Sequence, residues 1–226
     1  AGRAETPSFH VDSILNEWTF IYQSPMLLDM VGRPRKVSDA QILDAAERAI
    51  ALHGPAHVTL AHIAGEIGVV PAALVQRFSS KRGLLLAVAE RSAERVPGVF
   101  EDATAANDSP IAALHQALAR FVAGIDSPET LANSLAFLQL DLVDPDLKHL
   151  AITQAREMRA QIRLLLQAAT FAGELVRHDH GRLAQAVYTT YSGSLITWAI
   201  DGNRPLADWL QLDIDTLLTP YRPLTG

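Results

Sequence analysis

Residues 65–81, GEIGVVPAALVQRFSSK, decide the fold that the sequence predicts. The stretch ends one short helix, turns at Gly68, and enters a second helix at Pro71, a residue suited to the first turn of a helix. Ser79 or Ser80 then offers an N-cap for another helix. Two short helices joined by a tight turn containing glycine form a helix-turn-helix, in which the second helix can enter the DNA major groove.

The segment upstream of this unit also predicts a helix. Ser38 and Gln41 have the spacing of a capping box, and Gly54 with Pro55 should end the helix. Thr59 is then the candidate N-cap of the first helix of the pair. Apolar residues at three- and four-residue spacing predict one buried face, formed by Ile42, Ala45, Ala46, Ala49, Ile50 and Leu52.

Downstream, a helix should begin after Ser80 and carry Leu84, Leu85 and Val88 on its buried side. Pro97 and Gly98 should end it. Nearly half of the chain, 49%, is hydrophobic and only 6% is aromatic, a balance that favours helices over sheet. The sequence therefore predicts an all-α fold of about nine helices, the last five spanning about 110–124, 128–142, 144–170, 181–201 and 205–218.

The charge distribution divides the chain, whose net charge is -6. Residues 30–95 hold nine Lys/Arg against six Asp/Glu, whereas residues 96–226 hold nine against fifteen. Because residues 30–95 are basic and residues 96–226 are acidic, we expect only the first of these segments to bind a polyanion. Residues 1–29 fit neither part, and Met30 looks like a start site. We interpret them as an upstream extension, with an amphipathic packing segment or a disordered tail as the alternatives.

Cysteine is absent, so the sequence offers neither a disulfide framework nor a thiolate site, and this suits a reducing cytoplasm. No apolar run is long enough to span a membrane. Three groups of Asp and His could suggest an all-α hydrolase, namely DLVDPDLKH with His149, RHDHG and ALHGPAH. Asp144 and Asp146, however, suit a helix N-terminus. The two histidines of RHDHG are two residues apart, which is not the four-residue spacing that places two ligands on one helix face, and ALHGPAH is an ordinary helix end. We therefore expect no enzyme, no metal and no cofactor.

The string VTLAHIAGEIGVVPAALVQRFSSKRGLL, preceded by ILDAAERAIALHG, resembles the DNA-binding domain of the TetR family of bacterial regulators. The resemblance covers about a quarter of the chain. It implies a helix-turn-helix domain over residues 30–83 and a larger helical domain for ligand binding and dimerisation over residues 84–226. The implied function is a transcriptional regulator, most often a repressor, that binds a palindromic operator in double-stranded DNA as a homodimer.

In this interpretation Gln76 reads a base edge, because a carboxamide pairs with adenine through two hydrogen bonds. Ala72 and Ala73, next to Pro71, are small enough to approach the bases closely. The remaining candidates would hold phosphates or reach the minor groove as a basic arm. They are Thr59, Arg77 and Lys81 for the phosphates, and Arg33, Arg35 and Lys36 for the arm.

The rear domain would supply the other two functions that the resemblance implies. A mostly apolar ligand would lie among Phe100, Leu114, Leu118, Phe121, Leu138, Met158 and Ile162. The polar groups that could orient it are Asn133, Gln139, Gln154 and Arg156. Small and aromatic residues on the last two helices predict a dimer interface, or otherwise the core of the protomer. They include Tyr188, Tyr191, Ser192, Leu195, Trp198 and Trp209.

Two positions depart from the family pattern. Val70 stands where the family commonly has a serine that caps the second helix, and Val75 stands where it commonly has a tyrosine that touches a phosphate. These two residues support the alternative function, a helical ligand-binding or interaction protein whose helix-turn-helix no longer reads DNA.

Overall fold

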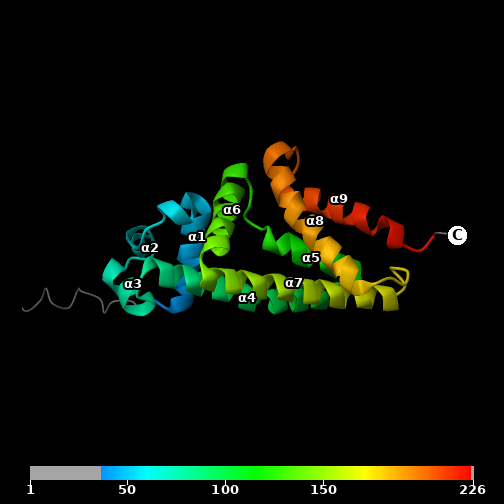
Figure 1. Ribbon diagram of the computed structural model, residues 1–226, viewed down its shortest axis with the longest axis horizontal. Helices are drawn as coiled ribbons and strands as arrows, with labels where there is room; N and C mark the ends of the chain where they lie inside the picture. The colour runs from blue at the N-terminus through cyan, green and yellow to red at the C-terminus, as the bar shows by residue number, and fades with distance from the viewer. Residues whose placement is uncertain (1–36, 225–226) are drawn as a thin grey trace, which may run out of the picture. The chain divides into compact units, whose positions relative to one another are not determined.

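The computed structural model describes residues 37–224, apart from the side chain of Asp141. Within that range the chain forms nine α-helices, one short 3-10 helix and no strand, which confirms the predicted all-α class (Figure 1). The helices are α1 (Asp39–His57), α2 (Leu60–Glu66), α3 (Pro71–Phe78), α4 (Lys81–Ala105), α5 (Pro110–Phe121), α6 (Pro128–Val143), α7 (Pro145–Phe171), α8 (His180–Asp201) and α9 (Leu206–Leu218), with the 3-10 helix at Thr219–Tyr221.

The first helix begins and breaks where the sequence predicts. Ser38 and Gln41 form the capping box, and at Gly54 the backbone leaves helical geometry with φ 71°. One further turn follows at Pro55 and extends α1 to His57. The placement of Leu52 on the buried face was wrong, since its side chain is exposed. The reason is angular, because two residues beyond Ile50 correspond to roughly 200° around a helix.

The predicted end of the fourth helix at Pro97 and Gly98 was also wrong, because α4 continues to Ala105. A proline inside a helix removes one backbone hydrogen bond and costs about 3 kcal/mol. Here Val96 and Phe100, on either side of it, are both fully buried, and their burial offsets that cost. The predicted boundary between residues 83 and 84 lies within the first turn of α4, and the division there stays a prediction.

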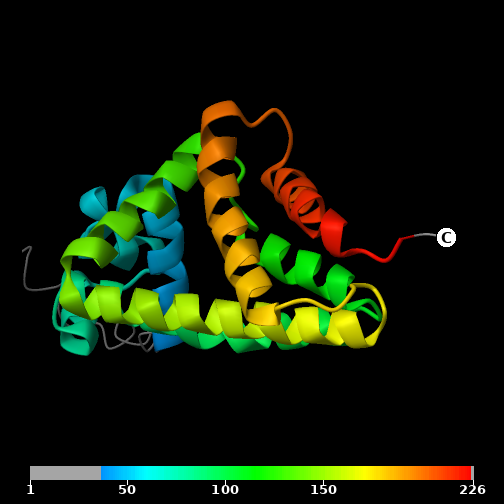
Figure 2. The ribbon, with the colours of Figure 1, turned by 45° about the vertical axis from the view of Figure 1, so that its right-hand side comes forward.

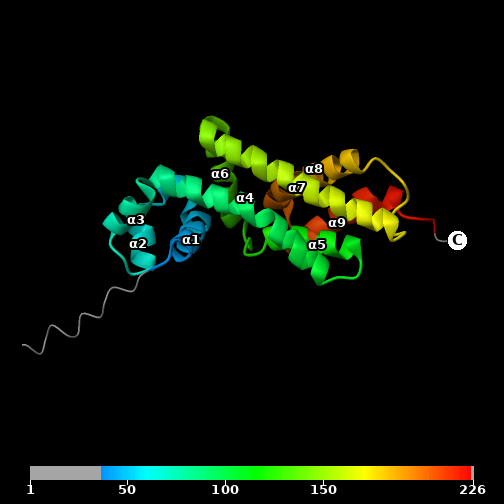
Figure 3. The same cartoon turned by 90° about the horizontal axis from the view of Figure 1, so that it is seen from below.

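The helices from α1 to α9 pack in two groups that share α4. Helices α1–α3, called the headpiece below, enclose a small core with the start of α4, and Ile42, Ile63 and Leu74 are among its buried members. Helices α5–α9, called the body, enclose a larger core with the rest of α4. Helices α4 and α7 run side by side (Figures 1 and 3), and α1 of the headpiece packs against α6 of the body (Figure 2).

We expect the stability of the body to depend on pH through His115. This half-buried imidazole on α5 contacts Asp215 of α9 at 3.2 Å, and its burial lowers its pKa below the ordinary value. The unfolded chain therefore binds a proton more readily than the folded one, so stability is full above about pH 6.5 and falls as the pH drops below it. The free energy of unfolding, measured with urea at several pH values between 5 and 7.5, should depend less on pH in His115→Gln than in the wild-type protein. An equal pH dependence in the two proteins would contradict this assignment.

Candidate functional site

The turn between α2 and α3 sets the direction of the second helix. The hydroxyl of Thr59 caps α2 by accepting a hydrogen bond from the His62 amide at 3.1 Å, as the sequence predicts. Gly68 lies in the turn with φ 70°, a conformation that favours glycine. Pro71 is the first residue of α3, and Val70 before it provides no side-chain cap. The predicted helix-turn-helix is therefore present, without the cap at its second helix.

Helix α3 packs on the headpiece with one face, and its other face is exposed to solvent. Leu74 is fully buried and Phe78, one turn later, is half-buried, so these two side chains hold the helix on the headpiece. Ala72, Val75 and Gln76 are exposed on the other side. Residues 72 and 76 are four apart and so share a face, and the small alanine leaves the carboxamide accessible to a partner in a groove.

The predicted phosphate-binding cations have contacts within the headpiece. Arg77 pairs with Asp39 at 3.1 Å, and the Lys81 ammonium donates to the carbonyl of Ala56 at 3.0 Å. Ala73, also among the predicted DNA contacts, is half-buried. An ion pair at a surface contributes little free energy, so a phosphate could replace Asp39 as the partner of Arg77 at small cost. The predicted arm of Arg33, Arg35 and Lys36, like the predicted extension 1–29, lies outside the described residues.

The missing cap gives a testable consequence. Val70→Ser should restore an oxygen acceptor for the first amides of α3 and raise the free energy of unfolding by about 1 kcal/mol. Val70 is 66% exposed, so little apolar burial is lost in the exchange. Chemical denaturation of the two proteins measures the difference. A destabilised Val70→Ser protein would show that this position has a role other than beginning the helix.

A cavity of about 460 Å³ lies between the headpiece and the body. Three of the predicted ligand-binding residues line it, namely Phe121, Leu138 and Gln154. Small-molecule sites typically enclose roughly 300–1,000 Å³. Phe100 instead lines a second hollow of about 480 Å³ between α4 and α7. Leu114, Leu118, Met158 and Ile162 are buried in the core of the body and line neither of these two cavities.

The sequence interpretation missed one wall of the first cavity. Glu47, Ile50 and Ala51 of α1 line it, together with Val88, Ala89 and Ser92 of α4. These residues lie in or beside the predicted DNA-binding domain, more than 30 positions before α6, so no local pattern relates them to a site in the body. The helical spacing of Ile50 and the other apolar residues of α1 indicates only that this helix has a buried face.

Helices α8 and α9 carry both buried and exposed apolar residues. Trp198 is buried within its own chain and its indole nitrogen donates to the Arg204 carbonyl at 2.8 Å, which favours the predicted alternative of a core position for it. The other five predicted interface residues are half-buried, and burial raises the pKa of Tyr191. Exposed apolar side chains that the sequence interpretation missed lie on the same two helices, namely Ile196, Ile200 and Leu212.

The Asp144 cluster has a structural role. Its carboxylate caps α7 and accepts two hydrogen bonds from Arg82 of α4, at 2.7 and 2.8 Å, while Asp146 accepts a third at 2.7 Å. The contact with Arg82 lowers the pKa of Asp144. Between residues 37 and 224 no cluster of three or more His, Cys, Asp or Glu residues could hold a metal ion, and no helix is long and apolar enough to cross a membrane.

Residues 42–88, which cover the helix-turn-helix, match the family described as bacterial regulatory proteins, tetR family. No protein of curated function matches the sequence significantly. The fold is similar to that of a TetR transcription regulator from Haloarcula marismortui, with a TM-score of 0.68 at 17% identity over 82% of this chain and 98% of that one.

Two further solved structures have the same fold. SmeT, the repressor of the Stenotrophomonas maltophilia multidrug efflux pump SmeDEF, gives a TM-score of 0.61 at 22% identity over 84% of this chain and 93% of that one. PfmR, a TetR family transcriptional regulator from Thermus thermophilus, gives 0.58 at 19% identity over 79% and 97%. At these identities the structural likeness establishes the fold, and residues 42–88 supply the match in sequence.

Proposed function

We propose that this chain is a sequence-specific repressor of transcription of the TetR type, since residues 42–88 match the tetR family of bacterial regulatory proteins and the fold is similar to that of solved TetR regulators. In this proposal it binds a palindromic operator as a homodimer in the cytoplasm and leaves the operator when a mostly apolar small molecule binds. The observation that carries the proposal is the open face of α3, which presents Ala72 and Gln76 while Leu74 holds the helix in place.

The dimer follows from what one recognition helix can contact. A single α3 has about two turns, so one copy reaches few bases, and two copies related by a two-fold axis read two half-sites about one helical turn apart. The exposed apolar residues of α8 and α9 support this pair of helices as the surface that joins the copies.

Gln76→Ala should lower affinity for the operator by roughly tenfold or more, since a good bidentate base contact contributes about 1–3 kcal/mol of discrimination. The loss should concentrate at one base pair of each half-site. Fluorescence anisotropy with the operator and its single-base variants measures both effects. Gln41→Ala, which removes a carboxamide from the capping box of α1, serves as a control for general effects of losing a glutamine.

The alternative is that the chain keeps the fold as a ligand-binding protein and no longer reads DNA. The observation in its favour is that α3 begins without a side-chain cap and exposes Val75 where a polar contact is usual in the family. Binding to duplex DNA that is weak, independent of sequence and lost at moderate salt would favour this alternative.

A further inference from the structure

We propose that the cavity between α1, α4, α6 and α7 binds an uncharged, mostly apolar molecule, and that α1 of the headpiece is an essential wall of this site. Ligand binding in this cavity does not depend on the proposed function. Only the effect of the ligand on DNA binding rests on it. It goes beyond a ligand site within the body, because the occupant would contact the DNA-binding part of the chain directly.

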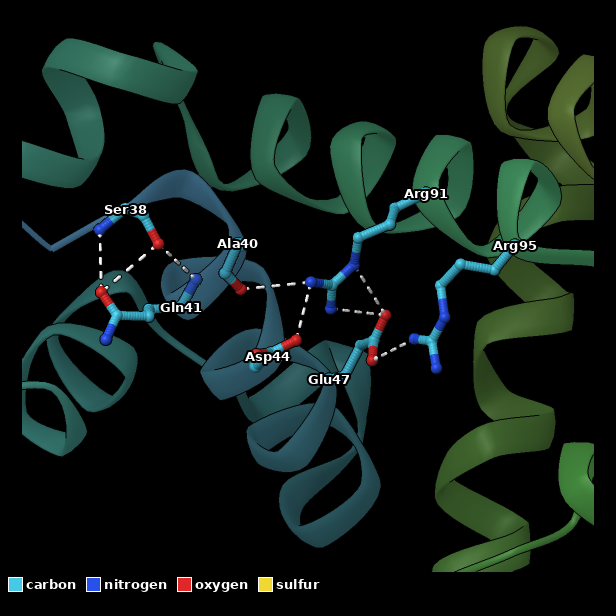
Figure 4. A network of polar contacts seen from close by, with 7 residues as sticks. All are labelled: Ser38, Ala40, Gln41, Asp44, Glu47, Arg91 and Arg95. Carbon is cyan, nitrogen blue, oxygen red and sulfur yellow. Dashed lines mark hydrogen bonds and ion pairs between the residues drawn. The ribbon is translucent and has the colours of Figure 1, made fainter. Parts of the chain in front are cut away.

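The charges around the cavity favour an uncharged occupant. Among the described residues, Glu47 is the only ionisable side chain that lines it. Both of its oxygens are engaged, one by Arg91 at 2.7 Å and the other by Arg95 at 3.3 Å. Arg91 also contacts Asp44 at 2.7 Å and the Ala40 carbonyl at 3.1 Å (Figure 4). Since these charges neutralise one another, an ionic ligand would enter without a counter-charge, which is unfavourable in a partly desolvated site.

Two polar groups in the lining could form hydrogen bonds with such a molecule and so fix its orientation. The hydroxyl of Ser134 donates to the Thr130 carbonyl at 3.0 Å, so its proton is already used. Within the described part of the chain, neither the hydroxyl of Ser92 nor the amide of Gln154 has a hydrogen-bond partner. Ser92 comes from α4 and Gln154 from α7, and a few such groups in an apolar pocket are typical of sites that fix the orientation of a small ligand.

One side chain of α6 makes hydrogen bonds to the wall formed by α1, in addition to the ion pairs that α4 makes with it. The Asn133 amide donates to the carbonyls of Ala51 and Leu52, both at 3.0 Å, at the point where α1 breaks. Glycine at position 54 makes room for this contact, since a Cβ there would lie 2.9 Å from the Asn133 Oδ1. Asn133 does not itself line the cavity. Loss of its hydrogen bonds should therefore weaken ligand binding only by loosening α1.

This arrangement couples the cavity to the position of the headpiece. An occupant that touches both α1 and the body has a different affinity for each placement of α1, and only such a difference can shift the equilibrium between them. The coupling acts in both directions. If the ligand favours one placement of α1, then a change that favours this placement also raises ligand affinity, and it changes the population of the placement that binds DNA.

The test uses two fluorescent probes that differ by one charge. N-phenyl-1-naphthylamine is uncharged and apolar, and 8-anilinonaphthalene-1-sulfonate is the same framework with a sulfonate. The full chain should bind the uncharged probe saturably and at least about tenfold more tightly than the sulfonate. Equal affinities, or no saturable binding of the uncharged probe, would overturn the proposal.

Two pairs of variants locate the site. Ala151→Trp fills the cavity and should abolish binding of the uncharged probe, whereas Ala168→Trp fills the hollow between α4 and α7 on the same helix and should leave it unchanged. Asn133→Ala should weaken binding roughly tenfold, because each lost hydrogen bond contributes about 1 kcal/mol. Asn107→Ala removes a comparable amide from the Ala103 carbonyl within the body and should have little effect. Circular dichroism checks that all four variants are folded.

The outcomes separate this inference from the proposed function. Probe binding requires no DNA, so the predicted pattern can hold even if the chain binds no operator, and then only the regulator proposal fails. If an operator is bound but Ala151→Trp and Ala168→Trp behave alike, the cavity assignment fails and the regulator proposal stands. Unchanged binding in Asn133→Ala would show that α1 is not an essential wall.

Discussion

Leu74→Ala is expected to lower the free energy of unfolding by about 3 kcal/mol and to abolish specific DNA binding. Leu74 is 0% exposed and is the only fully buried side chain of α3. Truncating a buried leucine removes its transfer free energy and leaves a cavity, with a combined cost of roughly 2–5 kcal/mol. Helix α3 has only eight residues and no N-terminal side-chain cap, so little else fixes its angle to the headpiece.

The neighbouring residue provides the control for this prediction. Val75 is 45% exposed on the same helix, and Val75→Ala should change stability by less than about 1 kcal/mol. Thermal or urea unfolding gives the stability of each protein, and anisotropy at a temperature where both are folded gives the DNA affinity. Retention of full operator affinity by a folded Leu74→Ala protein would contradict the view that Leu74 positions the recognition helix.

If the chain is the proposed dimer, Ile196→Asp combined with Ile200→Asp is expected to convert it into a folded monomer and to lower operator affinity at least roughly a hundredfold. Both side chains are exposed, at 51% and 81%, so aspartate should disturb the folding of the protomer little. In a dimer joined through α8 and α9, however, it would bury a carboxylate without a partner. A monomer then reads one half-site, and twofold symmetry no longer adds the second set of contacts.

Sedimentation velocity gives the oligomeric state and anisotropy gives the affinity. Leu52→Asp is the matched control, because Leu52 is 71% exposed on α1 and lies outside the proposed interface. It should leave the dimer intact. If the double variant stays dimeric, α8 is not part of the surface that joins the copies.

The sequence predicted the helices well because their ends are set by local chemistry. Caps such as Ser38, Thr59 and Asp144 act over three residues, and the buried faces repeat every three or four. The end of α4 could not be predicted in the same way. Pro97 is a local signal to stop, and it is overridden by the burial of Val96 and Phe100 against the body, which no short window contains.

The site was predicted less completely, for the same physical reason. The face of α3 follows from a short motif, so its exposed residues could be named in advance. The cavity depends on which distant helices meet, and the contribution of Glu47 and Ile50 of α1 follows only from the packing of α1 on α6. On α8, composition drew attention to Trp198, whereas burial separates it from the exposed Ile200.

Selection from a pool of duplexes with random cores, followed by sequencing, tests the central claim most directly. The wild-type protein is incubated with the pool at two salt concentrations, and Gln76→Ala is taken through the same procedure. We predict enrichment of one inverted repeat with half-sites about one helical turn apart, and its loss or a changed preference within each half-site for Gln76→Ala. Binding that enriches no sequence at either salt concentration would contradict the account of this chain as a sequence-specific regulator.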